Sequence, residues 1–252
     1  HPAPRSAIPP MLHDLLQQRR AVRYFDPERQ LDSERVRRRL EEAALAPTSS
    51  NMQLWECYHI TDPELIARLA PACFDQSAVR TASQLVAFAI TPQHWRAHAE
   101  AVLAFQREDL PRHFPEDKWP KYLALQENYY GKLIPLLYRH GWGLWGQLRR
   151  ALCTLVGLVR PVPRETTEAA MRTVLHKSCA LVIQSFLLGM SEEGYDTCPL
   201  EGFDSRRVAR LLELERGSEL TMLIACGYRS TERPEGGRFR LPFAQQYHRI
   251  GS

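Results

Sequence analysis

Short polar side chains gather at one point of the 252-residue sequence, directly before a segment that alternates like a strand. Thr48, Ser49 and Asn51 follow Pro47 and precede "LWECYHI" (54–60). Hydroxyl and amide groups of this size can hydrogen-bond a ligand without filling its cavity. The same residue types also favour a plain turn that ends a helix. By themselves, these residues leave both a ligand site and a turn open.

Arginines gather at two places near opposite ends of the chain. They are Arg19, Arg20 and Arg23 after a short predicted helix, and Arg238 and Arg240 in "GGRFRLP". Guanidinium groups form strong, charge-assisted hydrogen bonds with anions such as phosphate. An isolated arginine, however, is usually a solvated surface charge. A binding role therefore depends on the two groups meeting in the fold.

A third candidate is "PLEGF" (199–203), which contains Glu201 and Gly202. Glycine lets a ligand approach the backbone closely, although a lone P-x-E-G pattern also marks an ordinary turn. We interpret the preceding Cys198 as buried packing, because no neighbouring residue supplies a second thiol or a lowered pKa. The six cysteines are scattered singly, so we predict neither a metal site nor a disulfide framework.

The composition is that of a globular chain, with 44% hydrophobic residues and a net charge of only +4. That charge is too small to indicate nucleic-acid binding. The first ten residues lack the apolar run of a signal peptide, and the cysteines suit a reducing compartment, so we expect a cytoplasmic protein. Hydrophobic periodicity predicts helices at 11–20, 32–46, 168–193 and 204–215, and strands at 54–60, 84–90 and 219–228. Few strands among many helices indicate an α+β fold.

Four segments together resemble the nitroreductase family. They are "RRAVRYFDPER" from Arg19, "APTSSNMQLW" from Ala46, "GYDTCPLEGFD" from Gly194 and "LTMLIACGYR" from Leu220. The resemblance covers roughly 12–90 and 168–242. It implies a three-layer α+β fold with a central, mostly antiparallel sheet flanked by helices, and a homodimer that binds FMN between its protomers. We expect one FMN-binding domain at 10–242, interrupted by a helical insertion at 95–165.

The resemblance also implies a role for each candidate residue. Arg19, Arg20, Arg23, Arg238 and Arg240 match the cations around the FMN phosphate. Pro47, Thr48, Ser49 and Asn51 match residues that lie along the FMN of the partner protomer, and Gln76 matches an amide at the pyrimidine edge. Pro199, Leu200, Glu201 and Gly202 match the segment beside flavin N5, where the backbone of Glu201 and Gly202 takes the catalytic position. Arg80 is a candidate for the charge at N1 and O2.

The function implied by the resemblance is NAD(P)H-dependent reduction of electron-poor acceptors such as nitroaromatics or quinones, by a ping-pong hydride mechanism. Two alternatives remain open. One is a sister reaction on the same flavin, either reductive dehalogenation or dehydrogenation of a specific metabolite. The other is a non-enzymatic protein that holds flavin or docks on a membrane.

The segment 128–164 does not follow the family pattern. It contains no Asp or Glu, six cations and five tyrosines or tryptophans, interleaved with leucines. We favour a lid or dimer-interface element over a weak peripheral membrane contact, which this composition also fits. Nucleic-acid binding is the least favoured reading, because the aromatic residues lie among long aliphatic ones.

Overall fold

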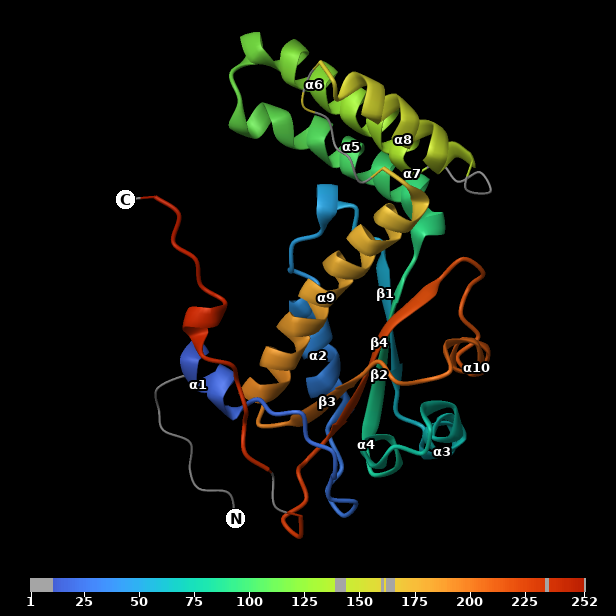
Figure 1. Cartoon of the computed structure of the whole chain (residues 1–252), viewed down its shortest axis with the longest axis vertical. Helices are drawn as coiled ribbons and strands as arrows, with labels where there is room; N and C mark the ends of the chain where they lie inside the picture. The colour runs from blue at the N-terminus through green and yellow to red at the C-terminus, as the bar shows by residue number, and fades with distance from the viewer. Residues whose placement is uncertain (1–10, 139–143, 160, 162–165, 234–235, 252) are drawn as a thin grey trace.

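A computed structural model describes residues 11–138, 144–159, 161, 166–233 and 236–251 of the chain (Figure 1). At the centre of this described part is a four-stranded antiparallel sheet with the spatial order β1-β2-β4-β3. The strands are β1 Trp55–Ile60, β2 Gln84–Ile90, β3 Asp196–Leu200 and β4 Glu219–Gly227. The predicted α+β fold with a mostly antiparallel sheet is confirmed.

Helices cover both faces of the sheet. They are α1 Leu12–Gln18, α2 Ser33–Ala43, α3 Pro63–Leu69, α4 Ser77–Arg80, α5 Trp95–His113, α6 Trp119–Asn128, α7 Ile134–Tyr138, α8 Leu144–Val156, α9 Glu168–Glu192 and α10 Ser205–Leu211. Figure 1 shows α2 and α9 on one face, and α3, α4 and α10 on the other. The sheet is therefore the middle of three layers.

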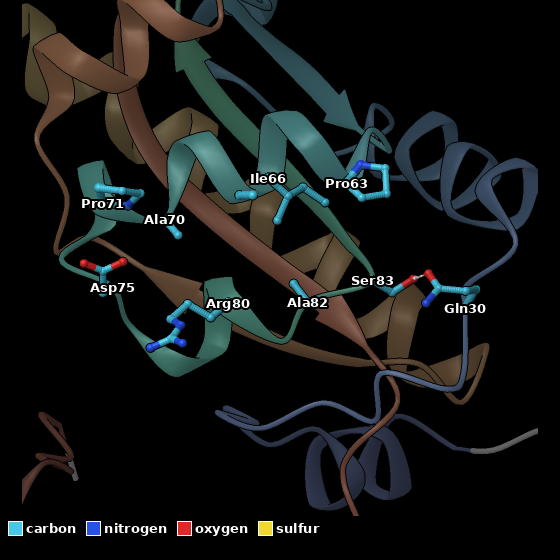
Figure 2. Close-up of a pocket in the computed structure, with 10 residues that line it drawn as sticks. Gln30, Pro63, Ile66, Ala70, Pro71, Asp75, Arg80, Ala82 and Ser83 are labelled. Carbon is cyan, nitrogen blue, oxygen red and sulfur yellow. Dashed lines mark hydrogen bonds between the residues drawn. The ribbon is translucent and has the colours of Figure 1, made fainter.

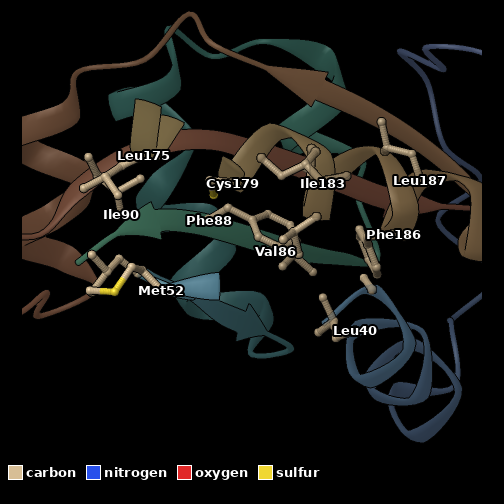
Figure 3. Close-up of a cluster of buried hydrophobic side chains, with 14 of the residues drawn as sticks. Leu40, Met52, Val86, Phe88, Ile90, Leu175, Cys179, Ile183, Phe186 and Leu187 are labelled. Carbon is tan, nitrogen blue, oxygen red and sulfur yellow. The ribbon is translucent and has the colours of Figure 1, made fainter. Parts of the chain in front are cut away.

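Strand β2 is buried along its whole length because helices cover both of its faces. Val86, Phe88 and Ile90 belong to the core beneath α9, whereas Leu85 and Ala87 belong to the core beneath α3. Figure 3 shows the first of these cores, in which side chains of α9 lie over those of β2. Because successive side chains of a strand point to opposite faces, one apolar run supplies both cores.

The long helix α9 has the ends that its sequence predicts. The side chain of Thr167 accepts a hydrogen bond from Ala170 N at 3.1 Å, and Gly194 follows the helix with a left-handed φ of 75°. By length and composition α9 could cross a bilayer. In the fold, however, its apolar residues pack in the core against the sheet, so it serves as the central helix of the layer that covers β2.

Helices α5 to α8 form a group of their own beyond one end of the sheet (Figure 1). They fall within the predicted insertion at 95–165, of which residues 139–143, 160 and 162–165 lie outside the described part. A π-helical turn, Tyr129–Leu133, joins α6 to α7. Such turns are rare and often occur at functional positions. This one places Tyr129 and Tyr130 within hydrogen-bonding distance of Ser50, in the loop that the family resemblance assigns to the flavin.

Candidate functional site

The first arginine group lies along the edge of the sheet. Val22 N donates to the carbonyl of Thr197 at 3.0 Å, and Ala21 and Thr197 form an isolated parallel bridge. Residues 19–23 are therefore held beside β3, which leads directly into Glu201 and Gly202. The fold brings two of the sequence motifs together by backbone pairing alone.

The two arginine groups converge, as the phosphate role requires. The pKa of Arg19 is lowered by burial and then by the charges of Arg238, Arg240 and Arg20. Arg20 Nη2 also donates to the carbonyl of Gly236 at 2.6 Å. Within the part of the chain that the structure describes, none of these arginines forms an ion pair with a carboxylate. A cluster of cations that lacks acidic partners is suited to an external anion.

Arg238 has a second task, which the sequence analysis does not predict. Its Nη1 donates to the carbonyl of Leu16 at 2.7 Å, and its Nη2 donates to Gln17 O at 3.0 Å and to the carbonyl of Arg19. These carbonyls lie at the end of α1, where helical partners run out. Arg238 therefore ties the C-terminal segment to the first arginine group, whereas Arg240 is exposed and donates to Phe239 O at 2.7 Å.

A groove of about 370 Å³ runs beside the first arginine group. Its lining includes Arg20, Arg23, Arg229, Arg233, Gly236 and Gly237. Arg229 is paired with Asp196, with its backbone N 2.9 Å from Oδ2, and Arg233 lies over the Tyr24 ring at 4.5 Å. Sequence reasoning missed Arg233, because only its position in the fold separates it from an ordinary surface arginine.

Gln76 meets Gly202 directly. Its Nε2 donates to the carbonyl of Gly202 at 2.6 Å and to that of Cys73 at 3.0 Å. Asp204 N donates to Ala72 O at 2.7 Å, so the loop before α4 is bonded to the loop after β3. These contacts bring the predicted ring-edge amide and the predicted N5 segment into one site.

Glycine at position 202 is not required by the protein's own packing. A Cβ built there would lie 3.5 Å from Gln76 Nε2, which is an ordinary contact, and Gly202 does not have a left-handed φ. What the missing side chain allows is a close approach to the backbone from outside. This favours a ligand over a structural reason for the glycine.

Cys198 is buried, as the sequence analysis predicts. Burial raises the pKa of its thiol, and the charges of Arg23 and Arg19 oppose this shift. The charges of Arg19 and Arg23 are therefore close enough to the Cys198 thiol, on β3, to affect its pKa. The described residues contain no group of His, Cys, Asp and Glu side chains that could hold a metal ion.

The loop that begins the β1 motif is strained. Ser50, Asn51 and Gln53 have φ values of 54°, 51° and 49°, which non-glycine residues rarely adopt. Within the loop, Gln53 N donates to Thr48 Oγ1 at 3.1 Å, and Ser49 N donates to Ser178 Oγ of α9 at 3.0 Å. Strain of this kind concentrates at ligand and active sites.

The insertion holds this strained loop from its other side. Tyr130 Oη donates to the carbonyl of Ser50 at 2.9 Å, and Tyr129 Oη shares a hydrogen bond with Ser50 Oγ at 2.7 Å. His98 Nδ1 of α5 lies 2.7 Å from the carbonyl of Met52. The insertion therefore helps to set the backbone of the residues assigned to the flavin.

In a single chain, the strained loop and the arginines do not meet. Ser49 is bonded to Ser178, whereas Arg19 follows α1, which packs beside the C-terminal part of α9 (Figure 1). The helix rises about 21 Å between Ser178 and Glu192. Pro47, Thr48, Ser49 and Asn51 are thus separate from Gln76, Gly202 and the arginine cluster.

Arg80 lines a different cavity, of about 610 Å³, on the side of α3 and α4 (Figure 2). Asp75, Ile66 and Ala70 also line it, and Ser83 Oγ donates to Gln30 Oε1 there at 3.0 Å. Asp75 and the preceding Phe74 are left-handed, with φ values of 51° and 56°. Neither Gln76 nor Gly202 lines this cavity, so the structure does not gather Arg80 with the candidate N5 segment.

Comparison of the sequence with models of known protein families identifies its family. The sequence profile of the Nitroreductase family matches residues 16–228. The chain belongs to the nitroreductase family. The prediction made from its four motifs is confirmed.

Relatives within the nitroreductase family match nearly the whole chain. Protein DrgA of Synechocystis sp. is 28% identical over 229 residues, which cover 91% of this chain and 89% of the relative. The putative NAD(P)H nitroreductase YdgI of Bacillus subtilis is 26% identical over 232 residues, with 91% and 92% covered.

Solved structures show the same fold. The putative nitroreductase ydfN of Bacillus subtilis has a TM-score of 0.70 at 19% identity, covering 94% of this chain and 97% of its own. A putative nitroreductase of Exiguobacterium sibiricum, solved in complex with FMN, has a TM-score of 0.66 at 24% identity, covering 95% and 97%.

Proposed function

We propose that this nitroreductase-family oxidoreductase binds FMN, takes reducing equivalents from NAD(P)H and reduces electron-poor acceptors such as nitroaromatics or quinones. The observation that carries the proposal is the line of contacts along β3. It runs from the arginine cluster at Arg19, past Cys198, to Gly202 and its hydrogen bond with Gln76. Relatives named as NAD(P)H nitroreductases and the FMN complex of a structural neighbour support it.

The donors on this line suit the chemistry of FMN. A phosphate dianion needs fixed cations, and Arg19, Arg20, Arg23 and Arg240 would supply them. Arg238 would act mainly by holding the C-terminal segment in place, since several of its N–H groups already bond the end of α1. At the other end, Gly202 leaves the backbone open to close approach, and Gln76 would fix the position of that backbone.

The position of the strained loop explains why the proposed flavin site would need residues from two protomers. Pro47, Thr48, Ser49 and Asn51 lie too far from the arginines in their own chain to share one ligand with them. In a homodimer, the loop of one protomer would complete the site built on β3 of its partner. We therefore propose that each dimer has two flavin sites, each made of residues from both chains.

When bound, FMN would supply the redox chemistry, accepting a hydride from NAD(P)H and returning it to the acceptor in a second half-reaction. The chain's own part is to bind and to orient. The arginine cluster would hold the phosphate, the backbone of Glu201 and Gly202 would line the predicted N5 position, and the loop at Ser49 of the other protomer would complete the site. Side-chain acid catalysis has no place in this proposal.

Reduction of bound flavin tests the proposal. The protein is purified, its flavin is identified by chromatography, and the visible flavin absorbance is followed without oxygen after NADH or NADPH is added. We expect FMN and rapid bleaching with at least one nicotinamide, followed by reoxidation when a nitroaromatic or a quinone is supplied. If neither NADH nor NADPH reduces the bound flavin, the proposed enzymatic activity is wrong and the protein only holds flavin. If the protein takes up no FMN on reconstitution, the proposed FMN site is wrong.

A further inference from the structure

The groove beside the first arginine group is a separate concentration of positive charge. Four arginines contribute to its lining, namely Arg20, Arg23, Arg229 and Arg233. Arg19, Arg238 and Arg240, which converge at the candidate phosphate position, do not line it. The groove of about 370 Å³ therefore lies next to the candidate phosphate site and is a cavity of its own.

Hydrogen bonds hold the walls of this groove in place. Ser230 N, in the segment that follows β4, donates to the carbonyl of Tyr24 at 2.9 Å. In the C-terminal segment, the carbonyl of Gly236 accepts from Arg20 Nη2 at 2.6 Å. Because three separate segments of the chain are bonded to one another here, the groove is formed by the fold itself and does not depend on a ligand.

The arginines of the groove are arranged for an anion from outside the chain. Arg229 is paired with Asp196, and its Nε lies 3.1 Å from Oδ1. In the described part of the chain, the other three groove arginines form no ion pair with a carboxylate. The guanidinium of Arg233 lies 4.5 Å from the centre of the Tyr24 ring. An arginine stacked on an aromatic ring still presents the N–H groups at its edge to a phosphate.

The groove lies at the opposite end of β3 from the candidate N5 segment. Asp196, which pairs with a groove arginine, begins β3, whereas Gly202 follows its end. Six residues of extended chain span about 20 Å at most. Between these two ends, the charges of Arg19 and Arg23 affect the Cys198 thiol. Under the proposed function, FMN occupies the line from these arginines to Gly202, so an anion in the groove would belong to another, longer molecule.

The lining distinguishes between NADH and NADPH, which differ by one phosphate on the adenosine ribose. In Rossmann folds, an Asp or Glu bonds the ribose 2′-hydroxyl of NAD, whereas an arginine accommodates the 2′-phosphate of NADP. The chemistry of these contacts does not depend on the fold that presents them. Among the described residues, the lining of the groove contains four arginines and no Asp or Glu. The groove therefore suits the phosphorylated ribose of NADPH.

We propose that the groove binds the 2′-phosphate of NADPH and that Arg233 makes the protein prefer NADPH to NADH. The inference rests on the proposed function, because it names the dinucleotide that would reduce the flavin. Arg233 would determine specificity and would not be catalytic, since it lies away from the predicted N5 position at Gly202. Stacking on Tyr24 would hold its guanidinium at the groove, and Arg20 and Arg23 would add positive charge around the same phosphate.

Nucleotide binding tests the inference without turnover. The purified protein, with FMN added, is titrated by calorimetry with adenosine 2′,5′-bisphosphate and, in parallel, with adenosine 5′-monophosphate. We expect the bisphosphate to bind about tenfold more tightly or better, because one charge-assisted contact contributes about that factor. Added salt should reduce the difference by screening the groove. Equal affinities for the two nucleotides would overturn the inference.

Variants of Arg233 test whether this residue causes the preference. Arg233→Ala should remove most of the difference between the two nucleotides. It should also lower the ratio of kcat/KM for NADPH to that for NADH about tenfold, mainly through the KM for NADPH. Arg233→Lys keeps the charge and should keep part of the preference. Arg68→Ala, which removes an exposed arginine of α3, is the matched control. An unchanged ratio in Arg233→Ala would contradict the assignment.

The same measurements separate this inference from the proposed function. If Arg233→Ala raises the dissociation constant of FMN, the groove belongs to the flavin phosphate and the inference is wrong. If NADH reduces the flavin as fast as NADPH and the two nucleotides bind equally, the inference is wrong while the proposed function stands. If neither nicotinamide reduces the flavin, the proposed function is wrong, but tighter binding of the bisphosphate that Arg233→Ala abolishes would still support the phosphate site.

Discussion

Replacing Arg19 by alanine should weaken FMN binding without destabilising the flavin-free protein. Burial and the charges of Arg238, Arg240 and Arg20 lower the pKa of the Arg19 guanidinium. A lowered pKa means that the fold disfavours the charged form, which is nevertheless the form present at neutral pH. The flavin-free fold therefore tolerates repulsion that a bound phosphate would relieve. Only the side chain is lost in the variant, so the Arg19 carbonyl still accepts from Arg238.

Arg19→Ala should therefore lower the affinity for FMN but not the stability of the flavin-free protein, and the size of the first effect can be estimated. A hydrogen bond to a charged group contributes about 1.5 to 3 kcal/mol. Since 1.4 kcal/mol corresponds to a tenfold change, the dissociation constant of FMN should rise about 10- to 150-fold. The midpoint of thermal unfolding of the flavin-free Arg19→Ala variant should equal or exceed that of the unmodified protein at low salt. Added salt should reduce the difference by screening the cluster.

The assay needs flavin-free protein, which is titrated with FMN while flavin fluorescence is followed, and is unfolded thermally in parallel. Arg68→Ala is the matched control, because Arg68 is an exposed arginine of α3 outside the cluster. An unchanged dissociation constant for Arg19→Ala would show that the phosphate binds elsewhere. A marked loss of flavin-free stability would make Arg19 a structural residue and refute the reasoning from repulsion.

Three further predictions concern the dimer, the insertion and the fold. Dimers mixed from an Arg19→Ala chain and an Asn51→Ala chain should hold one FMN each, because one of the two shared sites is intact; mixed dimers without flavin would mean that each site lies within one chain. Tyr130→Phe removes the bond to the Ser50 carbonyl and should lower the free energy of unfolding by about 1 kcal/mol and the affinity for FMN, whereas Tyr122→Phe, whose ring contacts Phe114, should change neither. Burial raises the pKa of Glu193, but bonding from Arg39 and the charges of Arg39 and Arg35 outweigh it and leave the pKa lowered. The stabilisation from Glu193 is therefore fully present above the ordinary carboxyl pKa and is lost as the pH falls through the lowered pKa of the folded state. Glu193→Gln should make the free energy of unfolding depend less on pH on the acid side. An unchanged pH dependence would contradict this.

Local sequence signals were sufficient where the element depends on its own residues. Six consecutive apolar residues, 85–90, predicted β2, and an apolar pattern at helical spacing predicted α9 to within a residue at each end. The N-cap of α2 is Asp32, whose side chain accepts from Glu34 N at 2.9 Å. Helix α3 could have been found in the same way, because Asp62 followed by a proline is a helix-start signal that the analysis did not use.

Strand β3 could not have been found from local signals. Its sequence, DTCPL, contains a proline and an aspartate, which are depleted in strands. It is a strand because Cys198 pairs with Ala225 and Pro199 pairs with Ile224 of β4, and the two residues of each pair are more than twenty positions apart in the chain. An edge strand tolerates proline, since one side of its backbone has no partner strand. The element that joins the arginines to Gly202 is therefore set by non-local pairing.

The conformation of the strained loop also could not be predicted from the sequence. Left-handed conformations at Ser50, Asn51 and Gln53 cost of the order of 1 to 3 kcal/mol each. The hydrogen bonds that hold the loop come from Tyr129, Tyr130 and His98 of the insertion, and from α9, and each contributes about 1 kcal/mol. These hydrogen bonds offset part of the cost, so the insertion helps to hold the loop in this conformation.

This balance gives the insertion a role that the family resemblance does not supply. The π-helical turn at Tyr129–Leu133 directs two consecutive tyrosines towards one serine, and their rings meet edge to face at 5.1 Å. A displacement of α6 or α7 would release both hydrogen bonds at once, because the two tyrosines are neighbours in the chain. Under the proposed function, the segment that departs most from the family pattern therefore fixes the loop that would complete the partner's flavin site.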